Sequence, residues 1–184
     1  MNLFNSNKII FAGGCFWGVQ NYFSQVRGII NTRVGYTQGI REFPNYEEVC
    51  SGATGHTEAV EVEWQTDKTN LNKLLDHYFN IVDPTTLNSQ AMDVGTQYRS
   101  GIYYYDTRDK EIILKYIEKI KGFYFDEIVT EILPAKEFWD AEDYHQMYLD
   151  KNPSGYCHIK KFKYTSIKEI DSELDKLDEI DEKI

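Results

Sequence analysis

The alternation of apolar and polar residues along the chain predicts strands and helices that intermix. Apolar, β-branched or alternating segments indicate strands at 8–12, 28–35, 56–65, 102–105 and 127–133. Apolar residues spaced three and four apart indicate helices at 15–26, 46–50, 71–82, 107–121 and 141–149. Because no strict strand–helix–strand repeat runs through the chain, the pattern favours an α+β fold with helices packed on a mixed sheet.

The last twenty residues are predicted to form an acidic amphipathic helix after an irregular segment. Residues 165–184 hold eight Asp or Glu and three Lys, a net charge of −5. Ser166 and Glu169 form a capping-box pattern that would start this helix. We therefore expect a single domain over 1–164 and a terminal helix over 165–184. That helix would either lie on the domain or bind a partner.

Charge and composition exclude several classes of protein. The 184 residues fit one domain, and the net charge of −10 argues against binding to nucleic acid or to anionic membranes. No apolar run approaches the ~20 residues of a membrane span. The first residues, Met1 to Asn7, are too short and too polar for a secretory signal. We expect a cytoplasmic monomer.

The cysteines do not form a disulfide framework. The chain has three, so at least one thiol is free, and no CxxC pair is present. The four histidines show no metal-ligand spacing, so no metal site is expected. We interpret Cys50, on its short helix, as an inert packed thiol.

Cys15 is the first candidate for chemistry. Gly13 and Gly14 break a strand just before it, and a helix follows, so Cys15 should lie at a helix N-terminus. There the helix dipole and the free N–H groups favour the thiolate, which predicts a thiol pKa lowered toward neutrality. Phe16 and Trp17 could form the wall of an apolar pocket. The alternatives are a buried structural cysteine among core aromatics and a phosphate-binding loop, although no known phosphate-loop pattern matches.

Glu58 is the second candidate. The alternation in its strand places it on the same face as Val60, Val62 and Trp64, at the start of the strand. Burial would raise the pKa of its carboxyl group, and a carboxylic acid that is protonated near neutral pH suits general acid catalysis. The alternative is a solvated strand start that leaves Glu58 as an ordinary surface acid.

Two further segments contain side chains that could take part in chemistry. The connection 93–100 is dense in hydrogen-bonding side chains, and Tyr98 there, like Tyr46 earlier, offers a neutral O–H donor. Cys157 follows a glycine in a mobile-looking tail and could reach Cys15 to form a disulfide. Taken alone, these segments could equally be a polar surface loop and a free surface thiol.

Together the segments resemble the A-type peptide methionine sulfoxide reductases over about residues 8–161. The match in order and spacing lies at 14–18, 46–52, 54–60, 93–100, 141–146 and 155–157. The resemblance implies a ferredoxin-like two-layer α+β sandwich. It also implies reduction of the S epimer of methionine sulfoxide, free or in oxidised proteins, without a prosthetic group.

The resemblance also implies roles for individual residues. Cys15 would attack the sulfoxide sulfur and Glu58 would protonate the oxygen. The substrate would be bound by Phe16 and Trp17 around its methyl group, and by Tyr46, Asp93, Tyr98 and Tyr156. Methionine would leave, and Cys15 would become a sulfenic acid. Cys157 would condense with it to a disulfide that thioredoxin or another dithiol reduces.

This chain departs from the family pattern in two places. No cysteine follows Cys157, so the disulfide should pass directly to the reductant without a relay. Ala91 and Met92 precede the loop aspartate where relatives have small or amide residues, and Met92 could alter the rim of the pocket.

Two other functions are compatible with parts of the sequence. Cys15 with His56 or His145 as a base would make a cysteine hydrolase or acyltransferase. Alternatively, the acidic terminal helix would be the active part of a non-catalytic interaction module.

Overall fold

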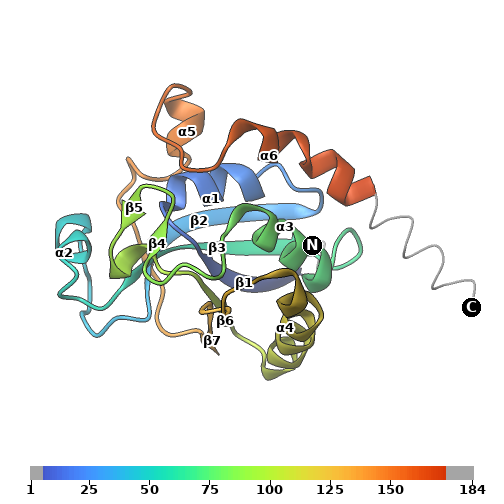
Figure 1. Cartoon of the computed structure of the whole chain (residues 1–184). Helices are drawn as coiled ribbons and strands as arrows, with labels where there is room; N and C mark the ends of the chain where they lie inside the picture. Colours follow the sequence, from blue (N-terminus) through green and yellow to red (C-terminus); the bar gives the residue numbers. More distant parts are fainter. Residues whose placement is uncertain (1–5, 173–184) are drawn as a thin grey trace, which may run out of the picture.

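The predicted strands pair into one six-stranded sheet in the computed structural model, which describes residues 6–172 (Figure 1). Its order is β7-β6-β1-β3-β2-β8. The strands are β1 (Ser6–Ala12), β2 (Ile29–Thr37), β3 (Thr57–Gln65), β6 (Gly101–Tyr104), β7 (Glu131–Pro134) and β8 (Trp139–Asp140). A separate short hairpin pairs β4 (Ser89–Gln90) with β5 (Asp93–Val94).

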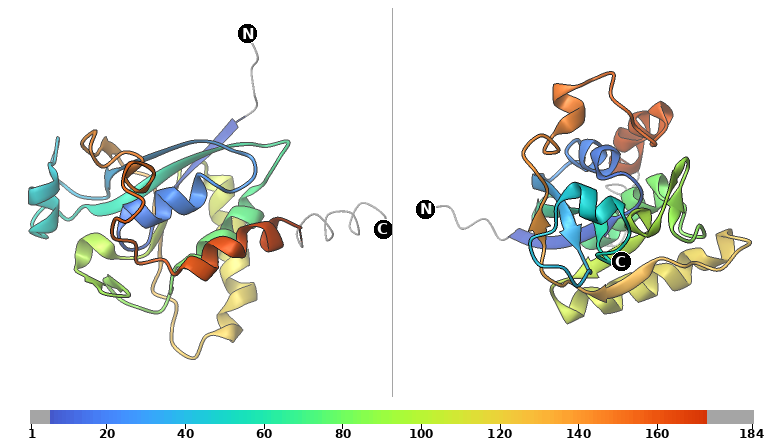
Figure 2. Two further views of the ribbon diagram at one scale, coloured as in Figure 1. Left: turned by 90° about the horizontal axis from the view of Figure 1, so that it is seen from above. Right: turned by 90° about the vertical axis from the view of Figure 1, so that its left-hand side faces the viewer.

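The helices are α1 (Phe16–Phe23), α2 (Tyr46–Cys50), α3 (Leu71–Ile81), α4 (Thr107–Ile120), α5 (Tyr148–Lys151) and α6 (Lys161–Thr165). Two 3-10 turns, η1 (Thr96–Tyr98) and η2 (Lys121–Phe123), complete the elements. Residues of α1, α3 and α4 share one hydrophobic core with the sheet, so these helices cover the same face (Figure 2). No helix in the described part of the chain is long and apolar enough to cross a membrane.

The central topology is ferredoxin-like. The elements β1-α1-β2-β3-α3-β6 follow the β-α-β-β-α-β order, and the four strands lie side by side as β6-β1-β3-β2 with every neighbour antiparallel. At one edge β7 runs parallel to β6, which makes the sheet mixed, and β8 extends the other edge. The predicted α+β sandwich is thus confirmed.

The two faces of β3 explain its alternating sequence. Val60, Val62 and Trp64 lie in the main core under the helices. Ala59 packs on the opposite face in a smaller apolar cluster. Glu61 is 4 % exposed on that opposite face, and its carboxylate accepts hydrogen bonds from the Arg33 side chain, with Nε at 2.8 Å, and from the Tyr105 hydroxyl.

Two predicted elements differ from the structure. The expected helix at 141–149 is a series of turns, and only α5 at its end is helical. The reason is that the Gln146 side chain accepts from Val34 N–H at 3.0 Å and donates to Val34 C=O at 2.8 Å, which ties the segment to β2. The expected strand at 127–133 begins only at β7, because Val129 N–H donates instead to Pro84 C=O.

The terminal helix begins earlier than the capping-box pattern predicts. Lys160 is the N-cap of α6, and helical residues continue from 167 to 172. Ser166 ends α6, and its hydroxyl donates to Lys163 C=O at 2.7 Å, so the capping-box prediction was wrong. Asp171 accepts from the buried His77 at 3.1 Å, which fixes this segment to α3. Most of the predicted acidic helix, residues 173–184, lies outside the described residues, and the division at 164 stays a prediction.

Candidate functional site

Cys15 lies where the sequence predicts, as the N-cap of α1 just after β1. The turn into the helix needs Gly14, because φ is +80° there and a Cβ would come within 2.8 Å of the Gln90 Cβ. Gly14 N–H donates to Tyr98 C=O at 3.2 Å, which joins the cysteine turn to the 93–100 connection. Cys15 itself is only 7 % exposed.

The predicted lowering of the Cys15 pKa was wrong for the substrate-free protein. Burial raises the pKa of the thiol, and the carboxylate charge of Glu58 raises it further. The N–H groups of Trp17 and Gly18 lower the pKa, as expected at a helix N-terminus, but desolvation outweighs them. The N–H groups at the helix start therefore favour the thiolate, but the protonated thiol remains the predominant form in the substrate-free protein.

Glu58 lies beside this turn and is buried, with 1 % of its surface exposed. Its Oε2 accepts a hydrogen bond from Phe16 N–H at 3.0 Å. Burial raises the pKa of the carboxyl group to about 8; the Phe16 hydrogen bond opposes this, and the charge of Asp93 adds to it. Glu58 is therefore mostly protonated at pH 7, and the alternative of a solvated surface acid is excluded.

Tyr46 and Tyr98 provide hydroxyl groups in the same environment. Both side chains are partly buried, and burial followed by nearby charges raises both pKa values, so the two hydroxyls stay protonated. The charge of Glu58 contributes to both shifts, and Cys15 contributes to that of Tyr98. Burial and the charge of Glu58 raise the pKa of the Cys50 thiol. Cys50 thus lies next to the site, which its interpretation as an inert packed thiol did not anticipate.

The two aromatic residues after Cys15 differ in exposure. Phe16 is 1 % exposed and packs against Tyr36 and His145, whereas Trp17 is only partly buried. Trp17 stacks on Tyr148 with ring centroids 3.8 Å apart, and its Nε1–H donates to His145 Nδ1 at 3.0 Å. Trp17 therefore forms the accessible aromatic surface, and both Trp17 and Phe16 pack against His145.

Glu142 and His145 belong to the site, although sequence reasoning gave Glu142 no role. The Glu142 carboxylate accepts from Tyr46 N–H at 2.9 Å and from the Tyr36 hydroxyl at 2.8 Å. It thereby fixes the start of α2, which carries Tyr46. One feature of the sequence could have indicated this role: residues 141–146 are denser in polar side chains than is usual for a helix with one apolar face.

Asp93 joins the 93–100 connection to the C-terminal tail. Its Oδ1 accepts from the Tyr156 hydroxyl at 2.9 Å. Its Oδ2 lies 3.8 Å from His158 Nδ1, and neither atom has a hydrogen-bond partner among residues 6–172. His158 Nε2 donates to Gly13 C=O at 3.1 Å, so the tail is attached to the end of β1 as well. Met92 lies at the turn of the β4–β5 hairpin and is 86 % exposed.

Cys157 lies against the first turns of α1. A Cβ placed on Gly18 would come within 3.2 Å of the Cys157 Sγ, so a larger residue there would have to push the thiol aside by a few tenths of an ångström. Gly18 follows Cys15 by three residues, and residues three apart on a helix are neighbours on one side. The Sγ also lies 3.4 Å from the Tyr164 hydroxyl oxygen. The structure thus brings the two cysteines to one end of α1, both as free thiols.

Both ring nitrogens of His56 and one of the two on His145 have hydrogen-bond partners, while His145 Nε2 has none among residues 6–172. His56 Nδ1 accepts from Gly39 N–H at 3.2 Å, and its Nε2 donates to Arg41 C=O at 2.7 Å. His145 Nδ1 is occupied by Trp17, and burial lowers the pKa of its imidazole. This geometry does not favour a cysteine–histidine hydrolase. Within residues 6–172, no group of three or more His, Cys, Asp or Glu could hold a metal ion.

Comparison with known proteins identifies a family for the chain. The sequence model of the family "Peptide methionine sulfoxide reductase" matches residues 7–175. A relative from Clostridium acetobutylicum, "Peptide methionine sulfoxide reductase MsrA", is 56 % identical over 154 residues, which cover 84 % of this chain and 95 % of the relative.

Solved structures agree with the sequence comparison. Mxr1 from Saccharomyces cerevisiae in reduced form is 37 % identical, with a TM-score of 0.80 over 86 % of this chain and 93 % of Mxr1. Mxr1 in complex with Trx2 is 26 % identical with a TM-score of 0.57, over 80 % of this chain and 87 % of that one. The chain therefore belongs to the peptide methionine sulfoxide reductases and is an oxidoreductase that reduces methionine sulfoxide.

Proposed function

We propose that Cys15 attacks the sulfur of the S epimer of methionine sulfoxide while Glu58 delivers its proton to the sulfoxide oxygen. The S–O bond of the substrate breaks as oxygen passes to the Cys15 sulfur. The products are methionine and a Cys15 sulfenic acid, so the cysteine is oxidised as the sulfoxide is reduced. The thiol proton restores Glu58, and no prosthetic group is needed to balance the step.

The surroundings suit both halves of the substrate. A sulfoxide is polar at oxygen and apolar at its methyl group. We assign the oxygen to Glu58 and the hydroxyls of Tyr46 and Tyr98, and the methyl group to the aromatic side chains of Trp17 and Phe16. Protonation matters because a neutral sulfoxide is a poor electrophile until its oxygen is protonated or strongly hydrogen-bonded.

Glu58 carries this proposal. Its carboxyl group is 1 % exposed, has a pKa of about 8 and accepts from Phe16 N–H at 3.0 Å, one residue beyond the nucleophile. A protonated Glu58 also removes the negative charge that raises the pKa of Cys15. The acid required by the oxygen and the thiolate required by the sulfur are therefore compatible at pH 7, which a deprotonated Glu58 would not permit.

Cys157 is proposed to resolve the sulfenic acid. Its thiol would attack the Cys15 sulfur, which forms the disulfide and releases water. Its position against α1 at Gly18 supports a direct reaction between the two cysteines. Thioredoxin would then reduce the disulfide, as the complex of Mxr1 with Trx2 suggests for a relative. We further propose a cytoplasmic monomer that acts on free or protein-bound methionine sulfoxide and binds neither nucleic acid nor membranes.

The first experiment measures turnover of the separated S and R epimers of a blocked methionine sulfoxide with dithiothreitol. The wild type should consume the S epimer alone, and Cys15→Ser should consume neither. Cys50→Ser is the matched control and should keep its activity. Turnover of the R epimer, or activity in Cys15→Ser, would refute the assignment.

Three further variants separate the acid from the resolving thiol. Glu58→Gln should keep part of the activity, because an amide still donates a hydrogen bond to oxygen, and Glu58→Ala should lose more. Equal rates in all three proteins would remove Glu58 from the mechanism. Cys157→Ser should release one methionine per enzyme and then stop with thioredoxin, whereas a small dithiol should sustain turnover.

A further inference from the structure

The segment around Cys157 has the opposite charge to the rest of the chain. Residues 151–168 contain five lysines and no Asp or Glu, in a protein with 30 acidic and 20 basic residues. The segment therefore carries +5 while the remaining residues carry −15. We call it the basic collar; its lysines are Lys151, Lys160, Lys161, Lys163 and Lys168.

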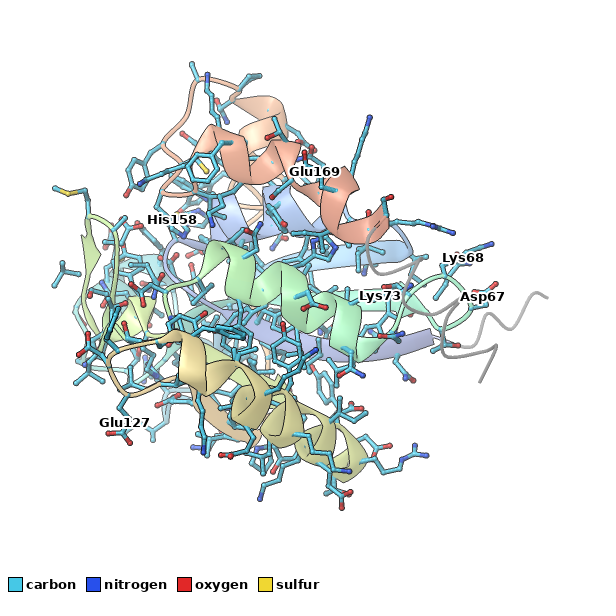
Figure 3. The ribbon with its side chains drawn as sticks, turned by 45° about the vertical axis from the view of Figure 1, so that its right-hand side comes forward. Asp67, Lys68, Lys73, Glu127, His158 and Glu169 are labelled. Atoms are coloured by element: carbon cyan, nitrogen blue, oxygen red, sulfur yellow. The ribbon has the colours of Figure 1, made fainter. Side chains whose placement is uncertain are left out.

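Part of the collar adjoins an exposed apolar surface a few residues after the proposed resolving thiol. Lys160 and Lys161 are exposed, and next to them Phe162 is 59 % exposed. A groove of about 440 Å³ runs between the end of α3 and the tail, and Lys160, Phe162 and His158 are among its lining residues. Figure 3 looks onto this side of the molecule, with His158 near the start of α6 and Glu169 further along the helix. Aromatic residues within a polar, charged rim are typical of protein–protein interfaces.

Three acidic groups near the collar have partners of their own, whereas Glu169 is exposed next to Lys168. Asp93 accepts from the Tyr156 hydroxyl, and Asp171 accepts from His77. Asp83 lines the groove, but its carboxylate accepts from the backbone and side chain of Thr85. The side chains of Lys160 and Lys161 remain open to solvent. The positive charge is thus available to a binding partner.

We propose that the basic collar is the docking surface for an acidic protein dithiol, the partner that reduces the Cys15–Cys157 disulfide. This inference rests on the proposed role of Cys157. Cys157 is the more exposed of the two cysteines, so the incoming thiolate attacks its sulfur and displaces Cys15 as a thiolate. The second thiol of the partner then displaces Cys157, which leaves the partner oxidised and both cysteines reduced.

Charge decides the orientation of this partner. An acidic protein is repelled by a chain with a net charge of −10 as a whole, and it is attracted most where lysines gather without acidic residues among them. Complementary charge of this kind increases the rate of encounter and selects the correct face. The sulfoxide substrate is neutral, so the collar offers no comparable advantage for binding the reacting group. A small uncharged dithiol gains nothing from the collar either.

The test compares two charge reversals in the full-length enzyme. Lys160→Glu/Lys161→Glu changes the collar, and Lys115→Glu/Lys119→Glu, on exposed positions of α4, makes the same change in net charge elsewhere (Figure 1). With an acidic thioredoxin as the reductant, the collar variant should raise the KM for thioredoxin by about five- to tenfold at low salt. The α4 variant should change it less than twofold, and added salt should reduce the difference. Turnover with dithiothreitol should be unchanged in both variants.

Several results would overturn the docking surface. An unchanged KM for thioredoxin in the collar variant, or an equal rise in both variants, would show that the collar does not select the partner. A raised KM for a peptide sulfoxide with dithiothreitol would assign the collar to the substrate instead. If thioredoxin failed to support wild-type turnover while dithiothreitol succeeded, the proposed recycling through thioredoxin would itself be wrong, and the docking surface with it.

Discussion

Replacing Glu58 by Gln should make the protein more stable at neutral and alkaline pH while lowering its activity. The folded protein raises the pKa of this carboxyl from an ordinary value of 4.5 to about 8, chiefly by burial. A group whose pKa is raised by folding favours the folded state below its unfolded pKa, and this contribution is lost as the pH rises through the folded pKa. The window for Glu58 is therefore pH 4.5 to 8, and Gln does not titrate within it.

The magnitude follows from the two pKa values. A difference between 4.5 and about 8 corresponds to about 5 kcal/mol between the two protonation states. About 1 kcal/mol of this stability is already lost at pH 5, and about 4 kcal/mol is lost at pH 8. The stability of the wild type relative to Glu58→Gln should thus fall by about 3 kcal/mol between these two pH values.

The assay is urea unfolding of both proteins at pH 5 and pH 8, with free energies from linear extrapolation. The difference between the proteins removes the pH dependence of the groups that they share. Glu61→Gln is a matched control on the same strand. Burial pushes the pKa of Glu61 upward, but hydrogen bonds from Arg33 and Tyr105 outweigh it and lower the pKa. Its contribution is therefore lost only in acid, and the Glu61→Gln difference should stay constant between pH 5 and 8.

A constant difference between the wild type and Glu58→Gln from pH 5 to pH 8 would refute the reasoning. It would mean that Glu58 titrates in the folded protein as it does in the unfolded chain. The carboxyl group would then be ionised at pH 7, and it could not supply the proton that the proposed reaction requires.

Three further outcomes follow from contacts near the cysteines and in the sheet. Gly18→Ala places a Cβ within 3.2 Å of the Cys157 Sγ, so it should slow disulfide formation after one turnover, measured by thiol titration, without slowing methionine release. Tyr164→Phe removes the hydroxyl 3.4 Å from that Sγ and should also slow this step, with a melting temperature close to that of the wild type; an unchanged rate would make the contact incidental. Arg33→Ala leaves the buried carboxylate of Glu61 without its arginine and should cost about 3 kcal/mol in urea unfolding.

Periodicity in the sequence predicted most elements because local pattern and tertiary packing agree there. The strand at Glu58 is the clearest case, since its alternation separates the main core from the opposite face. The helix prediction for 141–149 was wrong because Glu142 and Gln146 form long-range hydrogen bonds to α2 and β2, which no local pattern reveals. The predicted start of the terminal helix was wrong for a related reason. Ser166 and Glu169 fit a capping pattern, but contacts with α3 decide where the helix runs.

The residues of the candidate site could be predicted more readily than their protonation. Motif spacing placed Cys15 at a helix start and Glu58 on the inner face of its strand, and the structure places both there. The helix dipole alone suggested a lowered thiol pKa for Cys15. The opposite direction follows from burial, which depends on how the 93–100 connection and the tail close over the cysteine and therefore cannot be read from the residues nearby.

The thiol of Cys50 makes the fate of the sulfenic acid a kinetic competition. Cys50 lies close enough to the site for the charge of Glu58 to raise the pKa of its thiol, so a sulfenic acid at Cys15 has a wrong partner as well as a right one. Burial raises the pKa of Cys50, so little of this thiol is nucleophilic thiolate at pH 7. Fidelity then depends on the relative rates of attack by Cys50 and Cys157. Alkaline conditions, which increase the thiolate fraction of Cys50, would erode that fidelity.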